Sequence, residues 1–557
     1  MTDESTRPVV RTPYGDVRGR YEGCEGHRGR AGRDGRDAHD GRAGHDGHRI
    51  AVFRGIPYAA PPFGPRRFRP PEPPTPWDGV RDAGGFGPTA PKPPYSEAFA
   101  RLLSDPVVPG DDCLNLNVWT PEPGHGARLP VMVWIHGGAL TRGSSAVPVY
   151  DGRAFARDGV VLVSVNYRLG VEGYGLFPDA PPNPGLRDQL AALEWVQASI
   201  AAFGGDPDRV TVFGQSAGAI SVGALLASPR ARGLFRRAVL QSGPPEVSDR
   251  DKVRRMVRRM ATRLKIPATA AAFAAVDREL LLRVQGEVGR LSSPVLGGPA
   301  FGIVVDGDLV PRDPLDALTD GAAADVDLLL GWTRDEYRLW LVPGGLLERV
   351  DRLGAVALAG AMARCHCGPE VPRGYRTLHP DAGTADLVGQ LVTDHLLRVP
   401  LHRLADARGA GGRAYVYEFA WPSGRPGLGA CHALELGFVF DTHQAPESAK
   451  LAGQGAPEEL AEAMHTAWVR FAVDGDPGWR PWDASHPVRV FGDGDPHTVE
   501  GPRDRELALW AADRAATPLA APEPGPGAAT RPRSPLRGAE PLSVVRRLRR
   551  PGGVPRR

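Results

Sequence analysis

Gly214-Gln215-Ser216-Ala217-Gly218 follows the apolar run 210–213 and precedes a stretch rich in small residues, 219–227, that leads to Pro229. This order predicts a strand, a sharp turn and a helix, which is the setting of a nucleophile elbow of the G-x-S-x-G type. Such a turn forces the serine into strained backbone angles, so the residues two positions to either side need to be glycine. The elbow would lift the Ser216 hydroxyl to the carboxyl edge of a sheet, in front of a helix N-terminus that favours negative charge.

A second glycine-rich turn lies upstream. The apolar run 131–135 leads directly into His136-Gly137-Gly138-Ala139. A turn of this kind after a central strand presents backbone N–H groups to a developing oxyanion, and glycine lets a substrate carbonyl come close. An ordinary loop between a strand and a helix is the alternative interpretation. The downstream elbow favours the catalytic one, because the two turns together supply a nucleophile and an oxyanion hole.

Apolar strand-like runs alternate with helical patterns through the middle of the chain. The expected strands span residues 131–135, 160–165, 210–213, 238–241, 327–331 and 414–419, and residues 188–202 carry apolar side chains at helical spacing. Continuous apolar strands with intervening helices predict an α/β fold, with a mostly parallel sheet covered by helices on both faces. No repeat or linker interrupts residues 50–512, so residues 1–512 are expected to form a single domain.

The composition is typical of a soluble globular protein, with 41% apolar and 24% charged residues among 557. No apolar run is long enough to span a bilayer, and the N-terminus has no apolar segment behind its polar start. Neither stable membrane association nor secretion is therefore expected. Five scattered cysteines argue against a disulfide framework and for a reducing compartment. The expected location is the cytoplasm.

Two segments are expected to be disordered. Residues 22–48 are rich in Gly, Arg, Asp and His, and residues 513–557 are rich in Pro, Ala, Gly and Arg, so neither segment can bury an apolar core. The net charge of +3 is unevenly divided: residues 514–557 hold ten Arg and two Glu, which gives +8 there and −5 for the rest. We interpret the excess of arginine as compositional bias, and we expect no nucleic-acid partner.

Several long motifs occur in a fixed order along residues 9–21 and 50–512. They are Phe53-Arg-Gly-Ile-Pro-Tyr-Ala-Ala-Pro-Pro62, Asp111-Asp-Cys-Leu-Asn-Leu-Asn-Val-Trp119, Asn183-Pro-Gly-Leu-Arg-Asp-Gln189, Phe203-Gly-Gly-Asp-Pro207, Phe213-Gly-Gln-Ser-Ala-Gly218 and Gln241-Ser-Gly243. With them the chain resembles the type-B carboxylesterases, a family of the α/β-hydrolase fold that includes cholinesterases and bacterial para-nitrobenzyl esterases. The resemblance implies that fold and a serine carboxylesterase for small to medium neutral esters. It implies no metal and no organic cofactor, and the small-molecule ester is the only partner expected.

The resemblance also implies a role for each residue at a matching position. The implied catalytic triad consists of the nucleophile Ser216, the acid Glu336 and the base His432. The implied oxyanion hole consists of the backbone N–H groups of Gly138, Ala139 and Ala217. The order Ser, Glu, His along the chain is the order found in α/β-hydrolases. In such a triad His432 takes the serine proton, and Glu336 holds the imidazole tautomer.

Neighbouring residues offer alternatives. Asp335 is the rival acid, and if Glu336 is the acid, Asp335 is expected to pair with Arg334 or to cap local backbone. Cys431, beside the base, is interpreted as a packing residue. The tripeptide Cys365-His366-Cys367 has no distant pair of cysteines to complete a zinc site, so no metal is expected there.

Three positions depart from the pattern of the family. Ala90 stands where secreted members carry the cysteine that pairs with Cys113, which supports a cytoplasmic location. Tyr337 follows the acid, where glycine is common, and its bulk is expected to change the packing behind the triad. Gln215 stands where many relatives have glutamate, so one buried negative charge is missing, and no special affinity for cationic substrates is expected.

Two other functions are compatible with the same residues. An acyltransferase would form the same acyl-enzyme on Ser216 but pass the acyl group to an alcohol or an amine. A non-catalytic esterase-like binding module would not need a complete triad, so the presence of Ser216, Glu336 and His432 argues against it.

Overall fold

The computed structural model describes residues 7–23, 49–289, 300–408 and 412–516. The chain divides into two compact units, residues 1–513 and 514–557, and the elements below belong to the first unit except for the last turn of helix α19 (Asp504–Ala516). Disorder is expected for residues 22–48 and 513–557, and most of these residues lie outside the described ones. This disorder stays a prediction, as does the single domain expected for residues 1–512.

One large sheet dominates the first unit. Among the described residues it has eleven strands, in the order β14-β13-β12-β11-β10-β9-β7-β8-β6-β4-β3. The strands from β13 to β8 in this order are parallel, and the pairs beyond them are antiparallel. In the same order the strands span His497–Glu500, Pro487–Phe491, Ala414–Phe419, Asp327–Thr333, Arg237–Gln241, Gly205–Gln215, Leu129–Ile135, Val161–Val165, Asn115–Thr120, Arg49–Pro57 and Arg20–Gly23. A small separate sheet joins β1 (Val9–Thr12), β2 (Gly15–Arg18) and β5 (Val80–Asp82).

The six strands expected from the sequence correspond to β7, β8, β9, β10, β11 and β12, and the mostly parallel sheet is confirmed. Strands β3, β4, β6, β13 and β14 were not predicted from the apolar pattern. Strand β6 shows why, because two of its fully buried residues are asparagines. Asn117 donates to the hydroxyls of Ser145 and Ser164 at 2.9 and 3.0 Å. Satisfied polar side chains of this kind interrupt an apolar pattern without interrupting the sheet.

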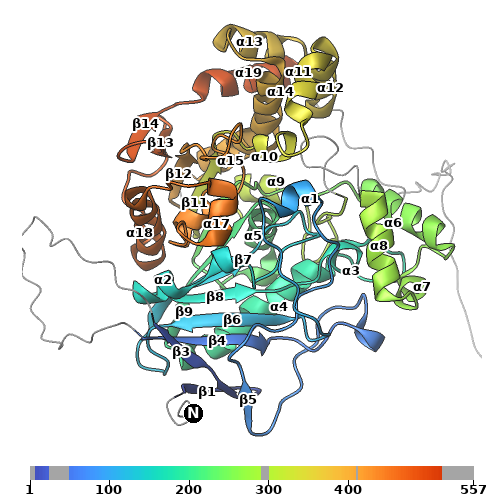
Figure 1. The fold of residues 1–557 in the computed structure, drawn as a ribbon, viewed down its shortest axis with the longest axis vertical. Coiled ribbons are helices and arrows are strands. Elements are labelled where there is room, and N and C mark those ends of the chain that lie inside the picture. The colour runs from blue at the N-terminus through green and yellow to red at the C-terminus, as the bar shows by residue number, and fades with distance from the viewer. Residues whose placement is uncertain (1–6, 24–48, 290–299, 409–411, 517–557) are drawn as a thin grey trace, which may run out of the picture. The chain divides into compact units, whose positions relative to one another are not determined.

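Helices cover both faces of the sheet, and alternate side chains of each central strand enter two separate cores. In β7, Val131 and Val133 belong to the core under α4 (Pro184–Ser199) and α5 (Ala217–Leu226). Met132 and Trp134 belong to the opposite core, under α2 (Arg153–Arg157) and α18 (Glu458–Asp474). Figure 1 shows this layered arrangement. The helix expected over residues 188–202 is realised as α4 and the short 3-10 helix Ile200–Phe203 that follows it.

A third apolar core lies among helices that follow β11, at the top of Figure 1. It is formed by α11 (Leu346–Leu353), α12 (Ala355–Cys365), α13 (Glu370–Leu378) and α14 (Thr384–Thr393), together with Trp510 of α19. The remaining helices are α1 (Glu97–Ala100), α3 (Gly170–Tyr174), α6 (Arg250–Leu264), α7 (Ala270–Ala274), α8 (Arg278–Val288), α9 (Pro314–Thr319), α10 (Arg338–Leu341), α15 (Val399–Asp406), α16 (Leu436–Val439) and α17 (Pro446–Ala452). Within the described part of the chain, no helix combines the length and the apolar character needed to cross a membrane.

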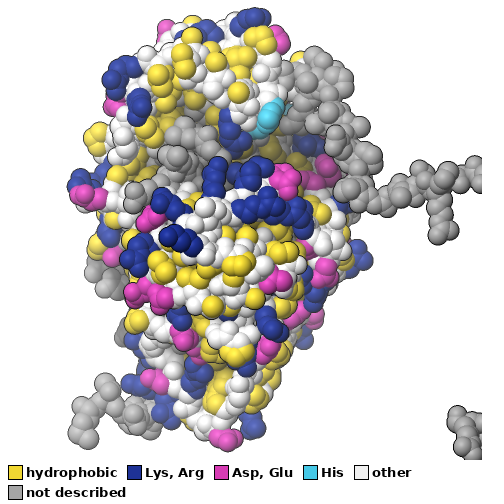
Figure 2. All heavy atoms as spheres, turned by 90° about the vertical axis from the view of Figure 1, so that its right-hand side faces the viewer, with side chains coloured by type: hydrophobic (Ala, Val, Ile, Leu, Met, Phe, Trp, Pro, Cys, Tyr) yellow, Lys and Arg dark blue, Asp and Glu magenta, His cyan; other side chains and the backbone are white. Residues whose placement is uncertain are grey.

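Helix α6 concentrates basic side chains on one face of the molecule. It buries Val253, Met256, Val257 and Met260 and exposes Arg255, Arg258, Arg259 and Arg263. The right-hand side of Figure 1, where α6 lies, accordingly carries a band of Lys and Arg side chains in Figure 2. Acidic neighbours reduce its charge, since Asp251 pairs with Arg254 at 2.9 Å. The expectation of no nucleic-acid partner stays a prediction.

Candidate active site

The turn between β9 and α5 has the strained geometry of a nucleophile elbow. Ser216 caps α5 with φ 57° and ψ −125°, and its N–H donates to the carbonyl of Gln241 at the end of β10, at 2.8 Å. A Cβ atom on Gly218 would lie 2.0 Å from the carbonyl oxygen of Ile135, and one on Gly214 would lie 2.6 Å from the carbonyl carbon of Gly218. Both flanking positions therefore require glycine, as the sequence predicted.

The loop after β7 lies against this elbow. Gly138, Ala139 and Leu140 all have positive φ, at 115°, 55° and 58°, which turns the backbone sharply. Gly138 and Ala139 line the same cavity as Ser216. Ala217 does not line it. It lies directly behind Ser216 as the first residue of α5, where its N–H has no acceptor within the helix. Gly138 and Ala139 thus lie at the same cavity as Ser216, and Ala217 follows Ser216 at the start of α5.

His136 supports this loop from behind. Its ring stacks on Tyr167 with the centroids 4.4 Å apart, and the Tyr167 hydroxyl donates to the His136 carbonyl at 2.6 Å. Burial lowers the pKa of His136 to about 3, so the ring is neutral near pH 7. We therefore assign His136 to the support of the loop.

His432 and Glu336 form a buried pair. The Nδ1 atom of His432 lies 2.5 Å from Oε2 of Glu336, and the other carboxylate oxygen accepts the backbone N–H of Thr333 at 2.8 Å. Burial raises the pKa of Glu336, but the His432 imidazole and these hydrogen bonds outweigh it and leave the pKa below its usual range. An ionised Glu336 only accepts hydrogen bonds, so the neutral His432 ring carries its proton on Nδ1 and its lone pair on Nε2.

The Nε2 atom of His432 faces Gln215. It lies 3.0 Å from the side-chain Nε2 of Gln215, whose amide donates to the imidazole lone pair. Among the described residues, no hydrogen bond joins Nε2 to the Ser216 hydroxyl in this arrangement, although Ser216 and His432 line the same cavity. The sequence identified Gln215 as a departure from the family but gave no signal of this contact.

Asp335, the alternative candidate for the catalytic acid, binds backbone instead of His432. Asp335 accepts the backbone N–H of Ala430 at 3.0 Å and lies 3.9 Å from Arg338. It therefore holds the loop that leads to His432, 95 residues further along the chain, rather than local backbone as expected. The expected alternative of a pair with Arg334 was wrong, because Arg334 pairs with Glu418 at 2.9 Å. Burial raises the pKa of the Cys431 thiol, which accords with a packing role.

Tyr337 points away from the triad. Its ring belongs to the third core, and its hydroxyl donates to Asp386 at 2.6 Å. A Cβ on Gly389 of α14 would lie 2.2 Å from the Tyr337 ring, so the glycine provides the room that the tyrosine needs. The bulk of Tyr337 is thus accommodated at α14, and the hydrogen bond between His432 and Glu336 is present beside it.

A second buried carboxyl group lies near the pair, and the sequence analysis missed it. Glu435 is fully buried, and one of its oxygens accepts from the Gln241 amide at 3.2 Å, while the other has no partner among the described residues. Burial and the charge of Glu336 raise the pKa of Glu435 to about 7. This carboxyl group therefore titrates near neutral pH.

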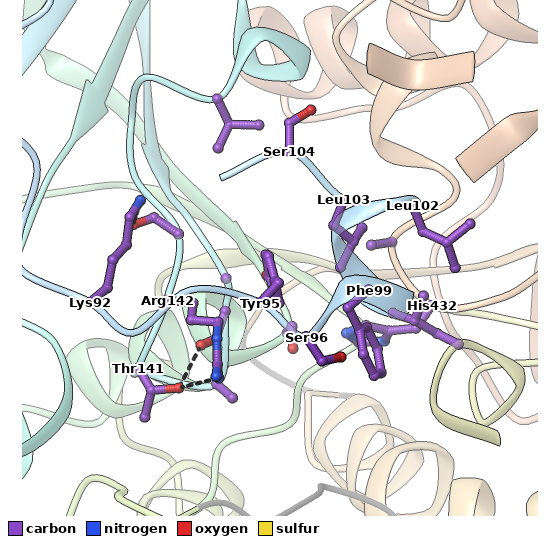
Figure 3. A pocket seen from close by; sticks show the side chains of 18 of the residues that line it. Lys92, Tyr95, Ser96, Phe99, Leu102, Leu103, Ser104, Thr141, Arg142 and His432 are labelled. Atoms are coloured by element: carbon purple, nitrogen blue, oxygen red, sulfur yellow. Dashed lines mark hydrogen bonds between the residues drawn. The ribbon is translucent and has the colours of Figure 1, made fainter. Parts of the chain in front are cut away.

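A cavity of about 1230 Å³ opens over the elbow. Ser216, Gln215 and His432 form its floor, Trp340 packs against the His432 ring with centroids 4.6 Å apart, and apolar side chains of and after α1 line another wall. Figure 3 shows Phe99, Leu102 and Leu103 on the side toward His432, and Arg142 and Thr141 on the opposite wall. Within the described residues, no group of three or more His, Cys, Asp or Glu side chains could hold a metal ion.

Comparisons with known proteins agree with this geometry. The profile of the family described as "Carboxylesterase family" matches residues 39–489. The para-nitrobenzyl esterase of Bacillus subtilis is 34% identical over 506 residues, which cover 86% of this chain and 93% of that protein. Phenmedipham hydrolase of Pseudarthrobacter oxydans is 35% identical, with 88% and 96% covered. A crystal structure of a Geobacillus stearothermophilus carboxylesterase has a TM-score of 0.76 at 37% identity, with 90% and 99% covered. These likenesses confirm the expected α/β-hydrolase fold.

Proposed function

Because the chain belongs to the carboxylesterase family and is a carboxylic ester hydrolase, we propose that it cleaves small to medium esters through an acyl-enzyme on Ser216. The observation that carries this proposal is the buried pair of His432 and Glu336, in the same cavity as a serine held on a strained elbow. The pair leaves the imidazole lone pair on Nε2, the atom that faces the cavity side of the elbow.

In the proposed reaction, Nε2 of His432 exchanges the Gln215 amide for the Ser216 hydroxyl as substrate enters. The serine oxygen attacks the ester carbonyl while His432 accepts its proton, and Glu336 stabilises the resulting imidazolium. His432 then protonates the leaving alkoxide, and the alcohol departs. Water activated by the same imidazole cleaves the acyl-enzyme and releases the acid.

The developing oxyanion is assigned to the backbone N–H groups of Gly138, Ala139 and Ala217. In the described structure the N–H groups of Gly138 and Ala139 donate to no backbone carbonyl. Ala217 is the first residue of α5, so its N–H has no acceptor within the helix. Both observations support this assignment. The loss of one such donor costs on the order of a hundredfold or more in turnover. No observation favours the acyltransferase or the non-catalytic module over the hydrolase.

We also propose that the protein works in the cytoplasm. Cys113 is a buried thiol that forms no disulfide with any described cysteine, and Ala90 occupies the position of its usual partner. Fractionation of the source cells with an antibody against the chain tests this location.

The mechanism predicts that Ser216→Ala lowers kcat/KM for p-nitrophenyl acetate and butyrate by at least about 10⁴-fold, because the nucleophile is lost. Release of p-nitrophenol measures the rate. The matched control is Ser221→Ala, which removes a hydroxyl from the same helix outside the cavity. A fluorophosphonate should label the wild type on Ser216 by mass spectrometry. Undiminished hydrolysis by Ser216→Ala would refute the proposed acyl-enzyme.

A further inference from the structure

Arg142 is anchored to the oxyanion loop. Its backbone N–H donates to the carbonyl of Gly138 at 3.0 Å, and a Cβ on Gly138 would lie 2.2 Å from the carbonyl oxygen of Arg142. The Arg142 side chain lines the same cavity as Ser216. The backbone of Arg142 is therefore fixed relative to Ser216, and its cationic side chain lies in the cavity that would hold the reacting ester.

The guanidinium of Arg142 has no ionic partner within the described part of the chain. No carboxylate oxygen there lies within 4.0 Å of it, and its long contacts are to the Thr141 hydroxyl at 3.5 Å and the Pro94 carbonyl at 3.4 Å. The Nε atom is buried without an acceptor, and the Tyr95 ring lies beneath the group at 5.3 Å. The side chain as a whole is half-buried, so a carboxylate of a ligand in the cavity would supply the ionic partner that the guanidinium lacks.

Lys92 is a second cation on the side of the cavity that carries Arg142 (Figure 3). Unlike Arg142, Lys92 has an ionic partner. It forms a buried ion pair with Asp105 and donates to the Gly143 carbonyl at 3.1 Å. Its charge is therefore neutralised locally, and Asp105 is no longer available to Arg142. The acidic residues of the cavity lie on α8 and α17, and none of them pairs with Arg142; they are Glu279, Glu287 and Glu447.

We propose that the enzyme prefers esters that carry a second, free carboxylate, which binds the Arg142 guanidinium while the ester carbonyl lies at Ser216. A planar guanidinium matches a carboxylate with two parallel hydrogen bonds, and an apolar cavity strengthens this contact. The proposal rests on the proposed function of the same site. It departs from the expectation of neutral esters, which the family resemblance implied, and agrees with the expectation from Gln215 of no special affinity for cationic substrates.

Pairs of esters that differ only in charge test this proposal. Butyl hydrogen glutarate carries the carboxylate on the acyl side, and its distal carboxamide is a neutral analogue of nearly the same shape. Carboxymethyl butyrate and carbamoylmethyl butyrate form the corresponding pair on the alcohol side. Chromatography of the released acid gives kcat/KM for each ester, and the ratio of carboxylate to carboxamide measures recognition of the charge.

We expect a ratio of about ten or more in the wild type for one of the two pairs, which also identifies the side that carries the carboxylate. The ratio should fall to about one in Arg142→Gln and be partly retained in Arg142→Lys, which keeps the charge but loses the planar fork. Arg101→Gln is the matched control. It removes an exposed arginine just after α1, outside the cavity, and should leave the ratio as in the wild type.

Two adverse results are distinguishable. Turnover of both members of each pair with a ratio near one, or a high ratio that Arg142→Gln preserves, would overturn the carboxylate site alone. Absence of turnover for all four esters and for p-nitrophenyl acetate would overturn the proposed function and this inference with it. Thermal unfolding of each variant, with Arg142→Lys as the conservative replacement, separates loss of recognition from loss of fold.

Discussion

Gln215 and Ser216 are adjacent in the sequence but meet different parts of the site. The Gln215 amide donates to His432, while its carbonyl group faces the oxyanion loop at Gly137. A neutral amide in this position donates to the imidazole lone pair. The residue before the proposed nucleophile thus contacts the atom that would accept the serine proton.

At this residue we predict that Gln215→Glu moves the acid limb of the pH profile of kcat/KM to higher pH by about one unit. A carboxylate about 3 Å from Nε2 stabilises the protonated imidazole, so the active fraction of the enzyme falls at a given acidic pH. Initial rates with p-nitrophenyl acetate between pH 5 and 9 measure the shift. The exposed Gln454→Glu adds the same charge away from the cavity and serves as control. An unmoved acid limb would contradict the role given to the amide.

At the scale of elements, the site depends on how closely β7, the elbow and α5 approach one another. The backbone of α5 at Gly218 lies against the end of β7, where even a methyl group would contact the Ile135 carbonyl. Because both sides of the contact are backbone, one in the central sheet and one in a helix packed on it, neither can move away cheaply. At Tyr337 a glycine serves a different purpose. Gly389 on α14 makes room for the large tyrosine ring, not for a close approach of two backbone segments.

Gly218→Ala is therefore expected to lower the free energy of unfolding by about 3 kcal/mol or more and to abolish esterase activity, through overpacking at the elbow. Gly360→Ala is the matched control within another helix, α12, where a Cβ meets open space. It should stabilise the protein by about 0.5–1 kcal/mol, because alanine favours a helix interior more than glycine does. Thermal unfolding and p-nitrophenyl acetate hydrolysis measure both. Equal effects of the two substitutions would contradict this account.

Across the whole molecule, stability and pH are linked through Glu435. Its pKa is raised to about 7 by burial and by Glu336, so the folded chain holds a proton that the unfolded chain releases near pH 4.3. Folded-state stability therefore falls as pH rises from about 4 to 7 and stays lower above that range. Glu435→Gln removes this loss. We expect it to raise the free energy of unfolding by on the order of 2 kcal/mol at pH 8 and by much less at pH 5.

Urea unfolding of Glu435→Gln and the wild type at the two pH values measures this difference. Glu418→Gln serves as a contrast, because three arginines lower the pKa of that buried carboxyl group against the effect of burial. Its substitution should destabilise the protein at pH 8. A pH-independent effect of Glu435→Gln would contradict the assigned titration.

The sequence predicted the central parallel strands because each is a continuous apolar run with a helix after it, as in β8 and β9. It did not predict β6, whose asparagines Asn115 and Asn117 are buried with partners from distant loops. Within the site, Ser216 and the glycines around it follow from local backbone requirements, whereas Glu336 and His432 were assigned through the family resemblance. Gln215 and His432 are 217 positions apart in the sequence, and no local sequence pattern predicts a contact between residues so far apart.

The order of the strands also has a consequence for synthesis of the protein. Strands β9 to β14 are added to one side of the sheet in chain order, and the proposed nucleophile, acid and base follow β9, β11 and β12 in turn. Ser216 is therefore synthesised well before His432. Because folding during synthesis proceeds from the N-terminus onward, the elbow is able to form first. A nascent chain that ends before residue 432 has an elbow but no base. In the proposed mechanism the serine is therefore not acylated by cellular esters until synthesis has passed residue 432 of 557.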